Sequence, residues 1–369
     1  MRVTQLTLTD FRCYHEVSVE FPPGVTVVVG DNGQGKTSLL EAVGWVATAR
    51  SFRGVPDAAL VRSDCEQAVL RAEVADDGRT QLLEAELHVQ ARNRVRLNRH
   101  PLGRARDLLG LLRVTVFAPD DLQLVKGGPG ARRGYLDELL VAITPRYEAA
   151  RADFERVLKQ RNALLRRGLT GEDALPTLAV FDEQLVQAGG ELVRGRRGLV
   201  DRLMGPVRAA YETIAGEPAE VGTVYEAEWA EGAVPPDANA VDELLRAALA
   251  ARRQQEIDRG VTLVGPHRDE WRLRVDGLDA RTHASQGEQR TLALALRLAG
   301  HRVCAELVGD EPVLLLDDVF SELDPVRAGA LVEHLPPGQT LLTTAASVPD
   351  GIRAELRLRV TDGKLEDMA

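Results

Sequence analysis

The stretch VVVGDNGQGKTS, from Val27 to Ser38, decides the fold. It connects the β-branched run Val25–Val29, which predicts a buried strand, to an apolar periodicity from Gly35 onward that predicts a helix. The G-x-x-x-x-G-K-T spacing is that of a P-loop, in which glycines let backbone N–H groups surround phosphate oxygens at a helix N-terminus. A chance glycine-rich turn is the alternative, and the order of strand, loop and helix disfavours it.

Two side chains of this loop have the chemistry that a bound nucleotide requires. Lys36 is placed to reach the β and γ phosphates, and the hydroxyl of Thr37 is placed to bind Mg²⁺. We therefore expect ATP and Mg²⁺ as cofactors. The expected ATP-binding residues are Gly30, Asp31, Asn32, Gly33, Gln34, Gly35, Lys36, Thr37 and Ser38.

A second part of the same site is expected near the other end of the chain. The apolar run Val313–Leu316 predicts a buried strand that ends in Asp317 and Asp318. Asp317 would bind Mg²⁺, and Asp318 would orient or deprotonate the attacking water, so Asp318 and Lys36 are the expected catalytic residues. A solvated acidic turn is the alternative. Because about 280 positions separate the two parts, an inserted domain is expected between them.

The pentapeptide SQGEQ, from Ser285 to Gln289, precedes a strongly helical run. Ser285 and Glu288 fit the S-x-x-E capping box, which is a purely structural interpretation. The pentapeptide also follows a P-loop and lies 32 residues ahead of Asp317. In this order it resembles the signature motif of ABC-type ATPases, whose usual form is LSGGQ.

The resemblance to ABC-type ATPases implies that two chains share each ATP site. In that family the signature serine and the N-terminus of its helix contact the γ-phosphate bound to the other subunit, and a helix N-terminus suits an anion. An ATP-dependent homodimer is therefore implied. The residues expected to act in trans are Ser285, Gln286, Gly287, Glu288 and Gln289, and the following SELD segment adds Ser321 and Asp324 as an expected D-loop.

Further blocks narrow the resemblance to one branch of these ATPases. They are FRCYHEVSVEFPPG from Phe11, RSFR from Arg50, FAPDDLQLVKGGPGARRGYLDELL from Phe117 and GPHRDE from Gly265. Together with the P-loop and SQGEQ they resemble the RecF family of SMC-like ATPases over most of the chain. This resemblance implies an α/β fold: an ABC-type ATPase head with a mixed sheet around the P-loop and a flanking antiparallel β part, interrupted by a mainly helical inserted domain.

The resemblance also implies a biological role. RecF-family proteins are weak, DNA-stimulated ATPases that dimerise on ATP as a clamp on double-stranded, gapped or junction DNA, or on single strands. They work with RecR and RecO to load RecA, and they support replication and the SOS response in the bacterial cytoplasm, at the nucleoid. Two alternatives stay open, namely an ATPase subunit of another ABC-type system and a nucleotide-switched DNA-binding protein without significant hydrolysis.

Two positions depart from the usual ABC pattern. Asp318 stands where most ABC ATPases carry Glu, and its shorter side chain predicts slow ATP turnover. The strand from Gln339 ends in Thr343 and Thr344, where transporters place a histidine. A hydroxyl is therefore the expected sensor of the γ-phosphate.

The net charge of −10 argues against bulk electrostatic attraction to DNA. A local basic segment can still bind phosphates, because screening limits each patch to roughly 8 Å in physiological salt. Such a segment follows Gln90 and contains no acidic residue until Asp107. It forms either a DNA contact or the solvated face of a hairpin, and its candidate DNA contacts are Arg92, Arg94, Arg96 and Arg99.

The three cysteines follow no metal-binding spacing, and no apolar run reaches the length of a membrane span. A cytoplasmic protein that makes no membrane contact is therefore expected.

Residues 1–115 and 260–369 are expected to form the discontinuous ATPase head, and residues 116–259 the helical insertion. Apolar stripes before and after Gly168–Pro176 predict an antiparallel pair of helices, each of only about 20 residues. Their many arginines form either a salt-bridged surface or a clamp on DNA. In GPHRDE, His267 and Asp269 either couple the insertion to the ATP site or satisfy hydrogen bonds in a turn.

Overall fold

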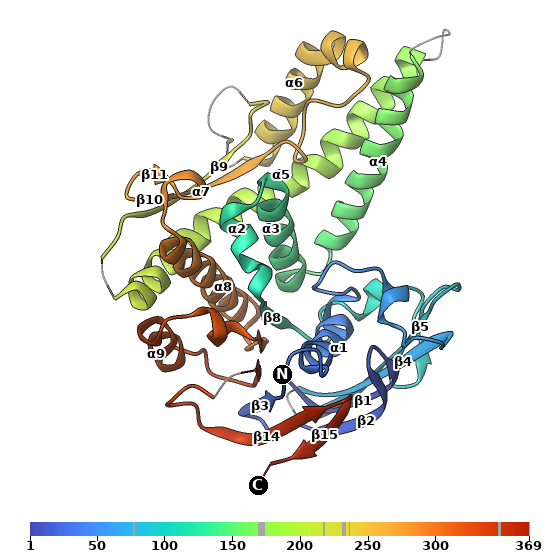
Figure 1. The fold of residues 1–369 in the computed structure, drawn as a ribbon. Helices are drawn as coiled ribbons and strands as arrows, with labels where there is room; N and C mark the ends of the chain where they lie inside the picture. The colour runs from blue at the N-terminus through green and yellow to red at the C-terminus, as the bar shows by residue number, and fades with distance from the viewer. Residues whose placement is uncertain are drawn as a thin grey trace. The chain divides into compact units, whose positions relative to one another are not determined.

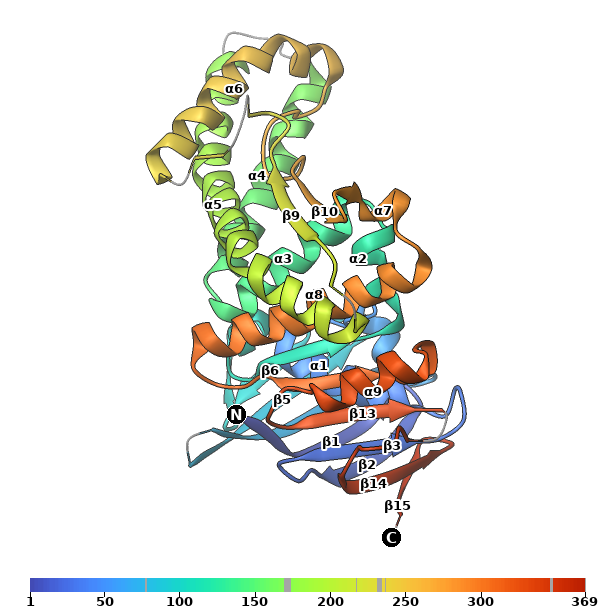
Figure 2. The ribbon, with the colours of Figure 1, turned by 90° about the vertical axis from the view of Figure 1, so that its left-hand side faces the viewer.

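The computed structural model describes residues 1–368 apart from residues 77, 169–173, 217, 231–233, 236 and 346–347. The chain forms two compact units, each assembled from separate stretches of sequence (Figures 1 and 2). The first unit consists of Met1–Asp121, Ala209–Pro218 and Ala293–Ala369, and the second of Leu122–Arg208 and Ala219–Leu292.

An antiparallel sheet forms one layer of the first unit. Its strands are β1 (Arg2–Phe11), β2 (Tyr14–Glu20), β4 (Gln67–Asp76), β5 (Arg79–His88), β6 (Arg94–Leu97) and β7 (His100–Pro101), in the order β2-β1-β4-β5-β6-β7. Apolar residues alternate along these strands, so one face is buried. That face includes Leu6 and Leu70, which share a core with Leu39 and Val43 of helix α1 (Lys36–Thr48).

A second sheet of the first unit brings the two ends of the chain together. Its strands are β3 (Val25–Val29), β8 (Val114–Phe117), β12 (Val313–Asp317), β13 (Thr340–Thr344), β14 (Ala354–Thr361) and β15 (Lys364–Asp367), in the order β15-β14-β3-β13-β12-β8. All neighbouring pairs are parallel except β14 with β15. Only β13 therefore separates the P-loop strand β3 from the acidic strand β12, which explains how the distant sequence motifs can share one site.

Short helices complete the first unit. They are η1 (Asp57–Leu60), η2 (Ala105–Leu108), η4 (Val319–Glu322) and α9 (Pro325–Glu333), with η3 (Pro119–Leu122) at the boundary between the units. Helix α8 (Gln286–Val308) begins in the second unit and continues into the first.

The second unit combines long helices with a small antiparallel sheet. Its helices are α2 (Gln123–Lys126), α3 (Pro129–Ile143), α4 (Tyr147–Arg167), most of α5 (Ala174–Ala215), α6 (Ala238–Arg259) and α7 (Ala280–His283). Its strands β9 (Val221–Glu226), β10 (Glu270–Val275) and β11 (Leu278–Asp279) pair in the order β11-β10-β9. A core that contains Phe154, Leu185 and Leu245 joins α4, α5 and α6 (Figure 1).

The boundaries of the two units differ from those expected from the sequence. Residues 260–292 belong to the second unit and not to the ATPase part, because β10 pairs along its whole length with β9. Residues 116–121 and 209–218 belong to the first unit. The inserted part is therefore not purely helical, since it contains a sheet that leads toward SQGEQ.

Helix α5 is much longer than expected. It has 42 residues, whereas α4 has 21, close to the expected length. Within α5, Gly195 allows close packing and does not end the helix: a Cβ there would lie 2.7 Å from the ring of Tyr147. Of the expected separator Gly168–Pro176, residues 169–173 lie outside the described part of the chain.

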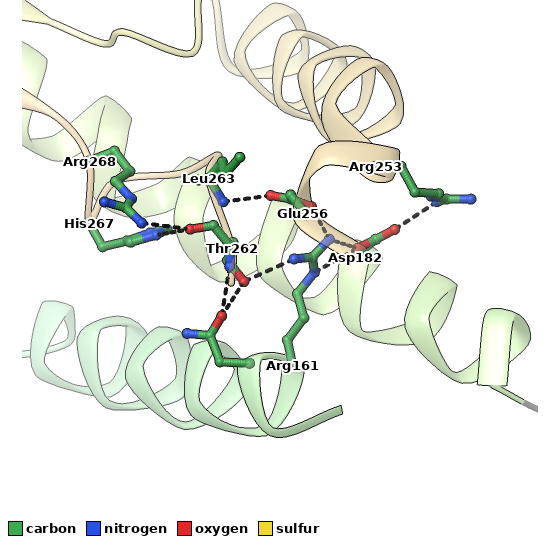
Figure 3. Close-up of polar contacts among 9 residues, drawn as sticks. Arg161, Asp182, Arg253, Glu256, Thr262, Leu263, His267 and Arg268 are labelled. Carbon is green, nitrogen blue, oxygen red and sulfur yellow. Dashed lines mark hydrogen bonds and ion pairs between the residues drawn. The ribbon is translucent and has the colours of Figure 1, made fainter. Parts of the chain in front are cut away.

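A buried arginine ties the helices of the second unit together (Figure 3). Arg161 on α4 is fully buried and donates to Asp182 of α5 at 2.8 Å and to Glu256 of α6 at 2.6 Å. It also donates to the Thr262 hydroxyl at 2.9 Å. Glu256 in turn accepts the Leu263 N–H at 2.7 Å. The cluster fixes the segment that leads into GPHRDE against three helices.

We expect Arg161→Met to destabilise the second unit strongly. Removing one partner of a buried ion pair leaves uncompensated charge and costs about 3–5 kcal/mol in the free energy of unfolding. Trp229 and Trp271 are buried in this unit, so urea denaturation followed by tryptophan fluorescence reports the change. The matched control is Arg246→Met, which breaks an exposed pair with Glu183 and should leave the midpoint unchanged. Equal midpoints for both variants would contradict the role given to Arg161.

Candidate ATP site

The loop between β3 and α1 forms a cradle suited to an anion. Gly33 and Gly35 adopt positive φ angles of 82° and 118°, which other residues rarely reach. The first N–H groups of helix α1 have no partner within the helix, as in any α-helix, and no side chain of the N-cap residue binds them. The Lys36 ammonium folds over the loop and donates to the Gly30 and Asp31 carbonyls at 2.7 and 2.9 Å. The cradle therefore combines free amides, a helix N-terminus and a positive charge.

The structure brings the P-loop threonine and the first acidic residue of β12 into contact. The Thr37 hydroxyl donates to Asp317 Oδ1 at 2.8 Å, and the Thr343 hydroxyl donates to the same oxygen at 2.8 Å. Burial raises the pKa of Asp317, and the hydrogen bonds from Thr343 and Thr37 oppose that rise. A hydroxyl and a carboxylate in contact are hard oxygen ligands of the kind Mg²⁺ uses together with phosphate oxygens and water. The donor set therefore fits the expected ion.

Asp318 lies beside Asp317 in a left-handed conformation, with φ 50°. Its N–H donates to the carbonyl and to the hydroxyl of Thr343, both at 3.1 Å. Its carbonyl accepts the Ser321 hydroxyl at 2.8 Å. Asp318 is thus held from both sides by backbone contacts, and among the described residues its carboxylate accepts a long contact of 3.4 Å from the Ala345 N–H. This carboxylate is half-buried, as a group that handles a water molecule should be.

Thr343 contacts both acidic residues of the site. Its hydroxyl is buried and already bonded to Asp317, and it also accepts the Asp318 N–H. It therefore orients Asp317 at the end of β12 and Asp318 directly after it, and the role in sensing phosphate expected from the sequence stays a prediction.

SQGEQ begins helix α8 and forms the capping box that the sequence allows. The Ser285 N–H donates to the Glu288 carboxylate at 2.7 Å, and the Glu288 N–H donates to the Ser285 hydroxyl at 3.3 Å. Gln289 is buried and donates to the Ala280 carbonyl at 3.0 Å. Ser285 and Gln286 are exposed, while Gly287 is half-buried. The capping interpretation is confirmed, and it leaves the start of α8 open to solvent within its own unit.

The expected D-loop residues have local structural partners. Ser321 donates to the Asp318 carbonyl. Asp324 caps α9 and accepts the N–H groups of Val326 and Arg327 at 3.1 and 3.0 Å. These backbone hydrogen bonds, with the Arg327 side chain, lower the pKa of Asp324.

The candidate DNA contacts lie on one hairpin of the antiparallel sheet. Arg94 and Arg96 project from β6 toward Glu86 of β5, at 3.9 and 2.9 Å. Arg92 donates to the Gly103 carbonyl at 2.8 Å, and Arg99 lies exposed at the turn before β7. These pairings favour the solvated hairpin for Arg94 and Arg96. Arg99 has no carboxylate partner among the described residues and is the better candidate for a phosphate contact.

GPHRDE has a clear structural role in the second unit. Asp269 is buried, receives hydrogen bonds from Tyr225 and from the Trp229 indole at 2.6 Å, and burial raises its pKa to about 6. His267 lies near Thr262 and donates to its carbonyl at 3.1 Å, and burial lowers the pKa of His267 to about 4 (Figure 3). His267 therefore satisfies a hydrogen bond within the turn, whereas the partners of Asp269 are distant in sequence, and coupling to the ATP site stays a prediction.

The sequence alone did not reveal a buried acidic residue one turn after the P-loop. Glu41 is fully buried and forms a bidentate ion pair with Arg12 at 2.9 Å, and Ser51 also donates to it. Arg53 lies 3.9 Å from the same carboxylate, and its charge acts on Asp317. The FRCY and RSFR segments therefore meet around α1. A lone Glu on an otherwise apolar helix face was the only sequence signal for this cluster.

Comparisons with known proteins place this architecture in a family. Residues 2–343 match the model described as the RecF/RecN/SMC N-terminal domain. The DNA replication and repair protein RecF of Frankia alni is 50% identical over an alignment of 366 residues that covers 96% of this chain and 96% of that protein. The chain belongs to the RecF family. RecF of Streptomyces avermitilis is 47% identical and covers 99% of this chain and 100% of its own.

Solved structures agree with this membership of the RecF family. The recombination mediator protein RecF of the RecFOR pathway, solved with ATP and with ATPrS, superposes with a TM-score of 0.91 at 29% identity. The match covers 100% of this chain and 97–98% of those chains. The Smc head domain of Pyrococcus furiosus superposes with a TM-score of 0.57 at 14% identity, and it shares the fold alone. The expected fold class is therefore confirmed.

Two observations concern other kinds of site. No helix in the described part of the chain combines the length and apolar character needed to cross a membrane. Among the same residues, no three His, Cys, Asp or Glu side chains gather as ligands of one ion. A Mg²⁺ ion at Thr37 and Asp317 would accordingly depend on phosphate and water for its other ligands.

Proposed function

We propose that this RecF-family chain binds and slowly hydrolyses ATP, and that ATP controls its attachment to DNA during repair and replication. The observation that carries the proposal is the contact between Thr37 of the P-loop and Asp317 of β12. It joins the phosphate cradle to an acidic strand end, as phosphoryl transfer requires. The ATP-bound state of the solved RecF relatives supports the choice of nucleotide.

Different residues of the proposed site bind the phosphates, hold the Mg²⁺ ion and activate the attacking water. Lys36 and the amides that start α1 bind the phosphates, and Thr37 and Asp317 hold Mg²⁺, which neutralises phosphate charge when bound. Asp318 orients the attacking water and accepts its proton. Its side chain is one methylene shorter than the usual Glu, so turnover is slow.

We further propose that a second copy of the chain completes the site. Ser285 and the exposed start of α8 provide a hydroxyl and a helix N-terminus, which together suit the γ-phosphate bound by the partner. ATP therefore links two chains into a dimer that closes on DNA. Hydrolysis opens it.

The partners follow from the family. The relatives are named DNA replication and repair proteins, and the RecF structures belong to the RecFOR pathway. We propose that this chain acts at gapped, junction or other double-stranded DNA, or on single strands, with RecR and RecO, and assists the loading of RecA in the SOS response. Its place is then the bacterial cytoplasm, on the nucleoid.

The proposal is tested by binding to fluorescent duplex, gapped and single-stranded DNA with ATP, with ADP and without nucleotide. ATP is expected to strengthen binding to at least one of these DNAs, and ADP is not. Binding that is equal in all three nucleotide states would contradict ATP control. Phosphate release in the same samples separates slow hydrolysis from a nucleotide switch that does not turn over.

Ser285→Asp is expected to keep ATP bound but to prevent dimerisation. Asp caps a helix as well as Ser, so folding is preserved, but its negative charge opposes the partner's γ-phosphate. Ser285→Asn is the matched control, because Asn caps the helix without adding charge. Light scattering with ATP should give the monomer mass for the Asp variant and a larger mass for the Asn variant. A dimeric Asp variant would exclude Ser285 from the shared site.

A further inference from the structure

Two other segments of the first unit donate hydrogen bonds to carbonyl groups of the P-loop. The Gly35 carbonyl accepts the Tyr14 hydroxyl at 2.9 Å. The Gln34 carbonyl accepts the Gly363 N–H at 3.3 Å and the Cys13 thiol at 3.7 Å. Cys13 and Tyr14 lie at the corner between β1 and β2, whereas Gly363 lies in the turn between β14 and β15. Residues distant in sequence thus meet at one loop.

The side chain of Gln34 is bound by the same C-terminal turn. Its amide oxygen accepts the Asp362 N–H at 2.6 Å. Asp362 and Gly363 have φ angles of 47° and 70°, so they form the two-residue hairpin turn in which both central residues are left-handed. Gln34 therefore receives hydrogen bonds from two successive N–H groups of one tight turn.

Three glycines allow this close approach. A Cβ on Gly363 would lie 2.5 Å from the Cys13 carbonyl oxygen, and a Cβ on Gly30 would lie 2.5 Å from the Val360 carbonyl oxygen. A Cβ on Gly35 would lie 2.5 Å from the Cys13 sulfur. No side chain fits at any of these points. The turn is therefore in close backbone contact with the loop and with the corner, whereas the side chains of Cys13 and Tyr14 contact the loop.

We propose that Tyr14 and the Asp362–Gly363 turn are positioning elements that hold the P-loop in its phosphate-binding shape before nucleotide arrives. The N–H and C=O of one planar peptide unit point in opposite directions. Fixing the Gly35 carbonyl therefore aims the Lys36 N–H, and fixing the Gln34 carbonyl aims the Gly35 N–H. Both N–H groups then face the anion, and no ordering cost remains to be met on binding.

Two observations support this role for Tyr14: its side chain is buried, and the Gly35 carbonyl oxygen that it contacts accepts two hydrogen bonds. The Tyr14 side chain is fully buried, and burial raises the pKa of its hydroxyl, so the group stays a neutral donor. The Gly35 carbonyl also accepts the Leu39 N–H at 3.1 Å, which uses its second lone pair. The carbonyl at the start of α1 is thus fixed by the helix on one side and by Tyr14 on the other.

The inference rests on the proposed ATP site, and two variants test it. Tyr14→Phe removes only the hydroxyl, and Gln34→Met keeps the side-chain length but removes the acceptor. Losing one such hydrogen bond should weaken binding roughly three- to tenfold. ATP and ADP should be affected equally, because the aimed amides serve phosphates that both nucleotides carry. In steady-state hydrolysis KM should rise while kcat stays the same.

Isothermal titration with ATP and ADP gives the affinities, and the melting temperature without nucleotide shows that each variant is folded. Glu366→Gln is the control, because Glu366 is an exposed residue of β15 that lies opposite Arg359 of β14. Gln34→Met keeps the test valid if Tyr14→Phe folds poorly. Unchanged affinity in both variants beside normal binding by the wild-type chain would overturn this inference alone. Failure of the wild-type chain to bind ATP would overturn the proposed function as well.

Discussion

Lys36→Met is expected to abolish measurable ATP binding at micromolar nucleotide. Methionine has nearly the same length but no charge, so the phosphates lose a buried charge-assisted contact. Removing one partner of such a contact costs about 2–4 kcal/mol, which corresponds to a dissociation constant raised roughly 30- to 1,000-fold. The measurement is isothermal titration or equilibrium dialysis with labelled ATP.

A control for Lys36→Met must separate the loss of the phosphate contact from a change in the structure of the loop. In the structure the Lys36 ammonium donates to the Gly30 and Asp31 carbonyls, so its loss also removes two contacts within the loop. Lys36→Arg keeps the charge in a different shape and should bind ATP with intermediate strength. Equal, wild-type affinity in both variants would show that ATP binds elsewhere or without this side chain.

Asp318→Asn is expected to stop hydrolysis while ATP binding persists. Asn has the same size but cannot accept the proton of the attacking water, and loss of a general base typically slows turnover about 10²- to 10⁴-fold. Because the ATP-bound state then persists, dimers and DNA complexes should accumulate. Single-turnover phosphate release and light scattering measure the two effects together.

Asp318→Glu tests the slow-turnover hypothesis from the other direction. The added methylene brings the carboxylate nearer to the water, so kcat should rise above that of the wild-type chain. If Asp318→Asn turns over at the wild-type rate, Asp318 takes no part in the chemistry. The alternative of a nucleotide switch without significant hydrolysis would then be favoured.

The arrangement of the candidate ATP site was largely predictable because its parts are local motifs. The P-loop needs a strand, a glycine loop and a helix in sequence order, and residues Val25–Thr48 supply all three. The acidic pair needs only a buried strand that ends in carboxylates. Their contact through Thr37 and Asp317 follows once both strands enter one parallel sheet.

The contacts that support the site could not be predicted in the same way. Tyr14, Glu41 and Gly363 act through partners far away in the sequence, and no spacing rule connects them. Glu41 is recognisable in the sequence only as a lone acid on an otherwise apolar helix face, and nothing there indicates that Arg12 is its partner. Long-range pairing of this kind becomes visible only in the folded chain.

The expected domain boundary at residue 260 differs from the boundary in the structure for a similar reason. The sequence after residue 260 alternates like the β structure of an ATPase head, but β10 pairs with β9 from the inserted part. Strand partners are chosen by tertiary packing, which periodicity does not report. Helix α5 is longer than expected because the apolar stripe after Pro176 continues as one helix to Ala215, and Gly195 within it packs closely against Tyr147.

The central claim is that ATP joins two chains through a site divided between them. Sedimentation velocity of the wild-type chain, with Mg²⁺ and either no nucleotide, ADP or ATP, tests it most directly. The account predicts a monomer of 40.2 kDa without nucleotide and with ADP, and a dimer with ATP. A dimer that forms equally without nucleotide, or a chain that stays monomeric at saturating ATP, would contradict it.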